Sequence, residues 1–120
     1  MPKSFHELCD EIKLNVKEIT IDDLKKMQSS GEKIKLIDVR EESEFAAGRI
    51  KGAVHLGKGI IERDIHKIAD GYDDKLVLYC GGGFRSVLAA DNLQKMGYTN
   101  VISMDGGWRG WNESGGDVEK

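Results

Sequence analysis

Residues 76–90 are the stretch best suited to catalyse a reaction, because an apolar run leads into a cysteine and then a glycine-rich loop. The residues that follow Cys80 are Gly81, Gly82, Gly83, Phe84, Arg85 and Ser86, and a helical pattern begins there. Successive glycines let several backbone N–H groups face one point, and the helix start adds its own unpaired N–H groups. Such surroundings lower the pKa of a thiol from its ordinary value of about 8.5. The stretch therefore predicts a reactive thiolate in an anion-binding loop.

A simpler interpretation makes Cys80 a small core residue, since free cysteines are often just buried apolar side chains. That interpretation does not explain why a strand, a cysteine, three glycines, an arginine and a helix follow in this order. The glycines also do not match the spaced G-x-G-x-x-G fingerprint of a dinucleotide site. We therefore favour a nucleophilic cysteine.

Composition places the chain among ordinary globular proteins. Its 120 residues predict one domain, and 39% of them are hydrophobic and 32% charged. The net charge of −3 gives no support for nucleic acid or an anionic membrane as partner. No apolar stretch approaches the ~20 residues that a membrane span needs. Two cysteines far apart make no disulfide framework, so we expect a reducing, cytoplasmic compartment.

The first helix carries the other cysteine. Ser4 to Glu7 form a capping-box pattern, and Cys9 lies on the apolar stripe that follows. His6 stands one turn before Cys9, yet no further ligands follow at zinc-site spacing. We expect Cys9 to pack in the core, His6 to be solvated, and the protein to use neither metal nor cofactor.

Hydrophobic periodicity predicts strands and helices in alternation. The expected strands are 16–19, 34–40, 52–56, 76–79 and 100–104, and the expected helices are 4–15, 20–30, 41–47, 61–70 and 86–96. Buried helix positions are expected to include Met96, and one continuous helix is expected to carry Ile61 through Ala69. This alternation predicts an α/β fold with a mainly parallel sheet and helices on both faces.

Ligands of such sheets bind beyond the carboxyl ends of the strands. That rule predicts one edge that holds Asp38, Arg40, Cys80 and Asp105. Asp38 and Arg40 either contact substrate or form a buried ion pair that fixes the loops, and for Asp38 we favour the ion pair. Arg63 is either an anion-binding group at the mouth or, as we favour, part of a solvated helix face.

Three motifs in order resemble the rhodanese family. They are Asp38-Val39-Arg40-Glu41 with Glu44-Phe45 and Gly48 to Ala53, then Cys80 to Ser86, then Gly106-Gly107-Trp108 with Trp111. The resemblance covers residues 16–112. The tail from Glu113 onward is polar and glycine-rich, so we expect residues 113–120 to be flexible. The resemblance implies a rhodanese-like domain over residues 16–112 and an N-terminal helical extension over residues 1–15. It also implies a five-stranded, doubly wound sheet.

The resemblance implies a sulfurtransferase. In the family, the loop cysteine attacks the outer sulfur of thiosulfate or a related donor and becomes a persulfide. The sulfur then passes to cyanide or a thiol. Cys80 would be the nucleophile, the amides from Gly81 to Ser86 would hold the terminal sulfur, and Arg85 would supply fixed charge and close the loop. Phe84 is either an apolar wall beside the persulfide or an exposed loop residue.

Loop length separates the alternatives. Four residues lie between Cys80 and Arg85, the spacing that goes with sulfur transfer, whereas the related phosphatases have five. The spacing therefore favours sulfur transfer. The alternatives are phosphatase or arsenate-reductase chemistry at the same thiolate loop, and a sulfur-carrier or partner-binding module. The expected partners are a small-molecule sulfur donor and acceptor, with a protein thiol as another acceptor, and the expected state is a monomer.

Overall fold

A five-stranded parallel sheet forms the centre of the protein in a computed structural model that describes residues 2–120. In spatial order the strands are β1 (Lys17–Ile19), β6 (Val101–Met104), β5 (Leu76–Tyr79), β2 (Lys35–Asp38) and β4 (Val54–His55). All four neighbouring pairs are parallel, as the alternating pattern predicted. Because parallel strands need crossover connections, the intervening helices fall on the faces of the sheet.

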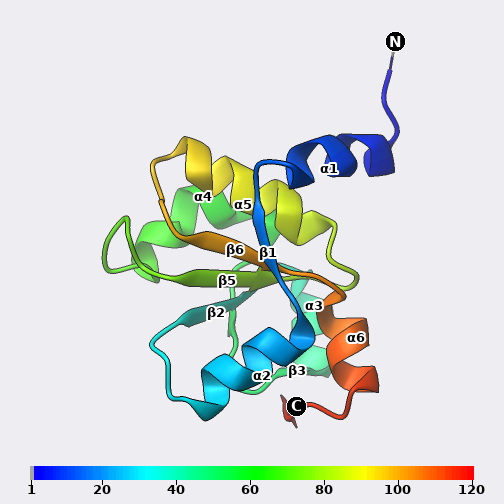
Figure 1. Ribbon diagram of the computed structural model, residues 1–120, viewed down its shortest axis with the longest axis vertical. Coiled ribbons are helices and arrows are strands. Elements are labelled where there is room, and N and C mark those ends of the chain that lie inside the picture. Colours follow the sequence, from blue (N-terminus) through cyan, green and yellow to red (C-terminus); the bar gives the residue numbers. More distant parts are fainter. Residues whose placement is uncertain (1) are drawn as a thin grey trace.

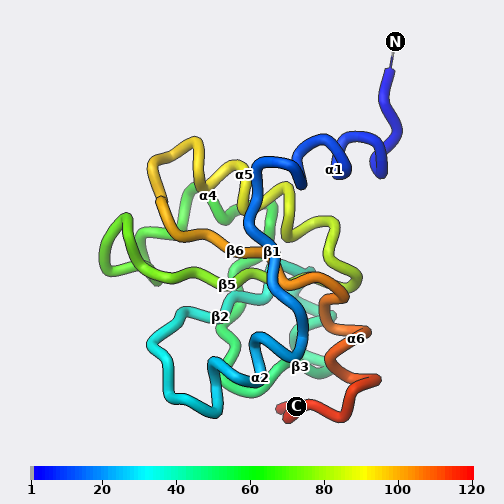
Figure 2. Tube along the Cα trace, viewed as in Figure 1, coloured from blue at the N-terminus to red at the C-terminus, as the bar shows by residue number. Residues whose placement is uncertain are grey.

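The helices cover both faces, as predicted (Figure 1). The α-helices of the described residues are α1 (Phe5–Lys13), which lies beyond the sheet, α2 (Ile21–Ser29), α3 (Glu42–Ala47), α4 (Ile61–Asp64), α5 (Arg85–Lys95) and α6 (Gly107–Glu113). Figure 1 shows α4 and α5 on one face and α2 and α6 on the other. The tube in Figure 2 shows the chain beginning with α1 beyond the sheet and ending at the opposite side of the molecule.

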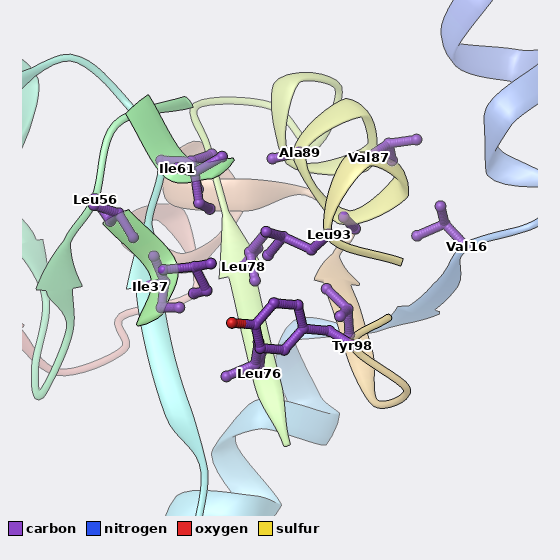
Figure 3. Close-up of a cluster of buried hydrophobic side chains, with 14 of the residues drawn as sticks. Val16, Ile37, Leu56, Ile61, Leu76, Leu78, Val87, Ala89, Leu93 and Tyr98 are labelled. Carbon is purple, nitrogen blue, oxygen red and sulfur yellow. The ribbon is translucent and has the colours of Figure 1, made fainter. Parts of the chain in front are cut away.

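The sheet divides the hydrophobic core into two clusters. One gathers under α4 and α5 around Ile37, Leu78 and Leu93 (Figure 3). The other gathers around Leu24 of α2 and Trp111 of α6. All four residues of β5 are buried, because a central parallel strand is covered on both faces. Strand β5 therefore gives a rigid base to whatever follows it.

Two helix starts are capped as their sequences predict. Ser4 and Glu7 exchange side chain to backbone hydrogen bonds at the start of α1. Thr20 and Asp23 do the same at the start of α2. Each capping box satisfies backbone N–H groups that the first turn leaves unpaired. Both sites confirm the predicted helix beginnings.

Two predictions for the helices were wrong. Residues 61–70 do not form one continuous helix, since α4 ends at Asp64 and a short 3₁₀ turn, Ile65–Lys67, follows it; another 3₁₀ turn, Lys58–Ile60, precedes it. Ile61 and Ile65 are nevertheless buried, because broken helical turns keep the same side of the chain toward the sheet. Met96 is 44% exposed, because α5 ends at Lys95 and Met96 is its C-cap.

A second, two-stranded sheet joins the end of the chain to the domain. Strand β7 (Val118–Glu119) pairs antiparallel with β3 (Arg49–Ile50). The Gly52 N–H also donates to Glu119 Oε1 at 2.6 Å. The sequence predicted neither strand and expected a flexible tail over residues 113–120. Strands of two residues leave almost no periodic pattern to detect.

Helix α1 packs against α5 rather than on the sheet. It anchors itself through Cys9, which is fully buried, and through Ile12, which packs on the cluster under α5. Phe5 and Leu8 stay 48% and 39% exposed. Across residues 2–120 there is no helix with both the length and the apolar character of a membrane span.

Candidate active site

Cys80 is the first residue after β5, and five residues later the chain enters α5. Strand β5 is the central strand of the sheet, so the loop begins at the carboxyl end of a rigid strand. Cys80 is only 1% exposed, and it stands at the base of the loop that leads to α5. The predicted order of strand, cysteine, glycine loop and helix is therefore the order in the structure.

The Cys80 sulfur lies inside a ring of donors. The Gly83 N–H donates to Cys80 Sγ at 3.1 Å, and Ser86 Oγ lies 3.6 Å from the sulfur. Ser86 Oγ is in turn 2.8 Å from Ser103 Oγ, on β6, so its position is fixed. Burial raises the pKa of Cys80, but hydrogen bonds from Ser86, Gly83 and Gly82 outweigh burial and lower that pKa below the ordinary thiol value. The loop thus favours a thiolate.

Helix α6 holds the loop from the other side. The Trp108 N–H donates to the Cys80 carbonyl oxygen at 2.7 Å, and the Arg109 N–H donates to the Gly81 carbonyl oxygen at 3.1 Å. Gly107 makes this approach possible, because a Cβ there would lie 2.4 Å from the Cys80 carbonyl oxygen. Its φ of +55° is a further reason for glycine. The closing glycine–tryptophan motif is therefore a clamp on the loop.

Arg85 closes the loop and ties it to α3. Its guanidinium nitrogens lie 3.2 and 3.4 Å from the two carboxylate oxygens of Glu44. The hydrogen bond from Arg85 is the main reason that the pKa of Glu44 is lowered, and the same bond raises the pKa of Arg85. Arg85 also lines the cavity at Cys80. Its position fits both predicted roles, a fixed charge at the mouth and a tie between loop and domain.

A cavity of about 410 Å³ opens onto Cys80. Its wall combines loop residues with two residues of α1 and one of α6, namely Phe5, His6, Cys80, Gly82, Phe84, Arg85 and Arg109. Sequence reasoning did not identify Phe5, His6 or Arg109. His6 was expected to be solvated, and it is exposed in the structure. The signal for Arg109 was available, since it is the basic residue inside the closing motif whose backbone clamps the loop.

Residues 20–114 match the family model described as rhodanese-like domain. The chain belongs to the rhodanese-like domain family. The match covers every strand of the main sheet except β1, and it includes the Cys80 loop and α6. Helix α1 lies outside it.

Relatives with known names agree with that membership. A thiosulfate sulfurtransferase of Haemophilus influenzae is 35% identical over 82% of this chain and 90% of its own length. The Bacillus subtilis protein YrkF is 31% identical over 81% of this chain, but the chain spans only 51% of YrkF. A solved structure from Rhodopseudomonas palustris, a protein of unknown function described as a possible tyrosine phosphatase, has a TM-score of 0.87 and 28% identity. The match covers 99% of this chain and 96% of that one. The chain is thus a rhodanese-like sulfurtransferase family member.

Phe84, in the rhodanese loop, contacts the helix outside the family model. Its ring centroid lies 4.7 Å from that of His6 and 6.1 Å from that of Phe5. Lys13 Nζ lies 5.0 Å from the centroid of the same ring. The Cys9 thiol donates to the Phe84 carbonyl oxygen at 3.8 Å. Phe84 is half-buried, and these contacts link the Cys80 loop to α1.

Asp38 and Arg40 form a buried ion pair, the interpretation that we favoured for Asp38. Arg40 Nη2 lies 2.7 Å from Asp38 Oδ2 and donates to the Gly48 carbonyl oxygen at 2.7 Å. The side chain of Arg40 is 4% exposed and that of Asp38 is 0% exposed, and neither lines the cavity at Cys80. Their hydrogen bonds fix the loop after β2.

Arg63 is exposed to solvent and pairs with the adjacent Asp64. Its side chain is 73% exposed and binds Asp64 through two hydrogen bonds, at 2.8 and 2.9 Å. Arg63 is not among the residues around the Cys80 cavity. Within residues 2–120, no three His, Cys, Asp or Glu side chains gather as a metal site would require.

Proposed function

We propose that this protein is a thiosulfate sulfurtransferase that moves one sulfur atom through a persulfide on Cys80. The donor is thiosulfate or a similar sulfane compound, and the acceptor is a thiophile such as cyanide or a thiol. The observation that carries the proposal is the environment of Cys80 Sγ, which accepts an N–H from Gly83 in a loop that lowers the thiol pKa. The thiosulfate sulfurtransferase from Haemophilus influenzae supports the choice of donor.

In the first half-reaction the Cys80 thiolate attacks the outer sulfur of thiosulfate. A new bond forms between the two sulfurs, the bond within thiosulfate breaks, and sulfite leaves with the electron pair. The thiolate is the reactive species, because a protonated thiol is a poor nucleophile. The hydrogen bonds around Cys80 therefore act before the donor arrives, by keeping the sulfur ionised.

The second half-reaction returns the enzyme to its starting state. The acceptor attacks the outer sulfur of the persulfide, and the bond to Cys80 Sγ breaks with return of the electron pair to Cys80. The terminal sulfur of a persulfide is anionic near neutral pH, so the loop amides and the first turn of α5 stabilise it. Arg85 adds positive charge at the mouth, which also attracts an anionic donor.

Intact-protein mass spectrometry tests the proposal. Reduced wild type is incubated with thiosulfate beside Cys80→Ser and Cys9→Ser. We expect one added sulfur atom on wild type and on Cys9→Ser, none on Cys80→Ser, and loss of that atom on addition of cyanide. An adduct on the Cys80→Ser protein would show that Cys80 is not the sulfur carrier.

The phosphatase alternative has one observation in its favour, the description of the Rhodopseudomonas palustris neighbour. The size of the loop argues against it. Four residues between Cys80 and Arg85 make a tighter ring of amides than five, and one sulfur needs less room than a phosphate with three oxygens. An aryl phosphate assay on the same preparations separates the two. Turnover of the aryl phosphate without sulfur loading would favour the phosphatase.

A further inference from the structure

Strand β6 carries one polar side chain, Ser103, into the core. Ser103 is fully buried, and its neighbours Ile102 and Met104 belong to the cluster around α2 and α6. Side chains alternate along a strand, so Ser103 points to the opposite face, which α5 covers and which Val101 also joins. A buried hydroxyl among apolar neighbours is costly unless it binds a partner. Packing alone therefore does not explain a serine at this position.

Cys80 lies on the same face of the sheet. Ser103 is in register with Leu78 of β5, and Cys80 follows Leu78 by two residues. Leu78 and Cys80 both belong to the cluster under α5. Ser86, in the first turn of α5, lies within hydrogen-bond distance of both Cys80 and Ser103. Three separate elements thus bring three small polar side chains together in the core.

These side chains form a continuous hydrogen-bonded chain. Ser103 Oγ lies 2.8 Å from Ser86 Oγ, and Ser86 Oγ lies 3.6 Å from Cys80 Sγ. Both serines are 0% exposed, and Cys80 is 1% exposed. Within residues 2–120, Ser86 Oγ is the one hydrogen-bond partner of the Ser103 hydroxyl. Buried surroundings strengthen such a chain, because each hydrogen bond polarises the next.

The partners determine where the hydroxyl protons lie. A thiolate only accepts hydrogen bonds, so the Ser86 hydroxyl donates to Cys80 Sγ when Cys80 is ionised. Ser86 Oγ is then free to accept, and the Ser103 hydroxyl donates to it. The reverse direction would leave the Ser103 proton without an acceptor among the described residues, and it would direct no hydroxyl proton to the sulfur. Only the direction from Ser103 to Ser86 to Cys80 satisfies all three groups.

We propose that Ser103 is a positioning residue for the Cys80 thiolate. It acts through Ser86, because its hydroxyl occupies a lone pair of Ser86 Oγ and thereby directs the Ser86 proton to the sulfur. The inference rests on the proposed function. In the first half-reaction the chain favours the ionised Cys80 that attacks the donor, and in the second it stabilises the thiolate that leaves the persulfide. Both hydroxyls keep their protons throughout, so neither serine is an acid or a base.

Substitution of Ser103 changes none of the charges near Cys80. The charged and titratable groups on the elements around the loop are His6 and Cys9 of α1, Asp38 and Arg40 after β2, Glu44 of α3, Arg85 of α5, Asp105 after β6 and Arg109 of α6. Four of these groups are already joined in two ion pairs. A change in the ionisation of Cys80 in a Ser103 variant therefore reports on the hydroxyl chain.

The test compares Ser103 variants that differ only in the hydroxyl. Ser103→Thr and Ser103→Val have the same shape, but only the threonine keeps the hydroxyl. Ser103→Ala removes the hydroxyl without adding volume, which avoids overpacking of the core. Val101→Ala is the control, because Val101 lies on the same face of β6 and is 3% exposed but has no hydroxyl. Alkylation of Cys80 by iodoacetamide is followed across a pH series by peptide mapping, and sulfur loading from thiosulfate is followed by mass.

Loss of the hydroxyl should raise the pH at which Cys80 ionises. In Ser103→Ala and Ser103→Val, alkylation and loading below the wild-type inflection should slow about two- to ten-fold, the range for one hydrogen bond, and should recover at higher pH. Ser103→Thr should keep the wild-type inflection. Val101→Ala should lower Tm and leave the inflection unchanged. Discharge of the persulfide by cyanide should also slow in Ser103→Ala and Ser103→Val, because a thiolate of higher pKa is a poorer leaving group.

A double variant tests whether Ser103 acts through Ser86. When Ser86 is already alanine, a further change of Ser103 to alanine should not move the inflection. An equal shift with and without Ser86, an equal shift in Ser103→Thr and Ser103→Val, or a wild-type inflection in Ser103→Ala would each refute the positioning role and leave the proposed function intact. If wild type does not load sulfur while the alkylation profiles follow the expectation, the proposed function fails, and Ser103 positions the thiolate for another reaction.

Discussion

Substitution of Gly107 by alanine tests whether α6 clamps the catalytic loop. The new Cβ would lie 2.4 Å from the Cys80 carbonyl oxygen and 2.9 Å from both the carbonyl carbon and oxygen of Gly81. All three are backbone atoms, so the clash cannot be relieved by rotating a side chain. Either α6 or the loop must move, and the 2.7 Å hydrogen bond from the Trp108 N–H to Cys80 lengthens or breaks.

Two effects contribute to the expected loss of stability. The left-handed backbone costs a residue with a Cβ about 1–2 kcal/mol. Overpacking adds about 1–3 kcal/mol, which makes a total of about 2–5 kcal/mol. In a domain of this size each 1 kcal/mol corresponds to about 3–5 °C in Tm. Gly107→Ala should therefore lower Tm by about 6–25 °C.

Gly31→Ala is the matched control, because Gly31 has a φ of +71° but no atom within 4 Å of its would-be Cβ. It should lose only the backbone part, about 3–10 °C, and keep its rate of sulfur loading. Thermal unfolding followed by circular dichroism and loading followed by mass spectrometry measure both quantities. Equal Tm losses in the two variants, with normal loading by Gly107→Ala, would refute a rigid clamp between α6 and the loop.

Three further predictions concern single side chains. The rate of alkylation of Cys80 by iodoacetamide should show its pH inflection below the ordinary thiol pKa, because the lowered pKa keeps Cys80 ionised at lower pH. Cys9, whose pKa is raised by burial, should react only in denaturant. Peptide mapping across a pH series measures both rates. Arg40→Met should cost about 3–5 kcal/mol in urea unfolding, since it leaves Asp38 buried without its partner, and a loss under 1 kcal/mol would contradict that role. Arg63→Ala should keep wild-type kcat/KM for thiosulfate, and a tenfold loss would place Arg63 at the mouth after all.

The parts of the site that are local in sequence could be predicted from sequence. The apolar run before Cys80, the three glycines and the helical pattern from Ser86 all belong to one stretch. Each of them acts through its nearest neighbours, so spacing alone indicated strand, loop and helix. Residue type indicated the buried pair of Asp38 and Arg40 as well, because a strand that ends in opposite charges offers an ion pair within two residues.

The rest of the site depends on contacts between distant segments. Nothing in the pattern around His6 indicates that its ring lies 4.7 Å from that of Phe84, because the two residues meet only after α1 has packed on α5. Arg109 reaches the mouth because α6 turns back onto the loop at Gly107. The small sheet of β3 and β7 joins residues that are equally far apart.

This division has a physical consequence for the enzyme. The hydrogen bonds that lower the pKa of Cys80 come from the short loop between a central strand and a helix and from the first turn of that helix, and none of them comes from α1. The wall opposite that loop comes from α1 and α6, which contact it through two rings, one weak thiol hydrogen bond and two backbone hydrogen bonds. We therefore expect substitutions in α1 to change the wall of the cavity while leaving the hydrogen bonds that lower the pKa of Cys80 in place.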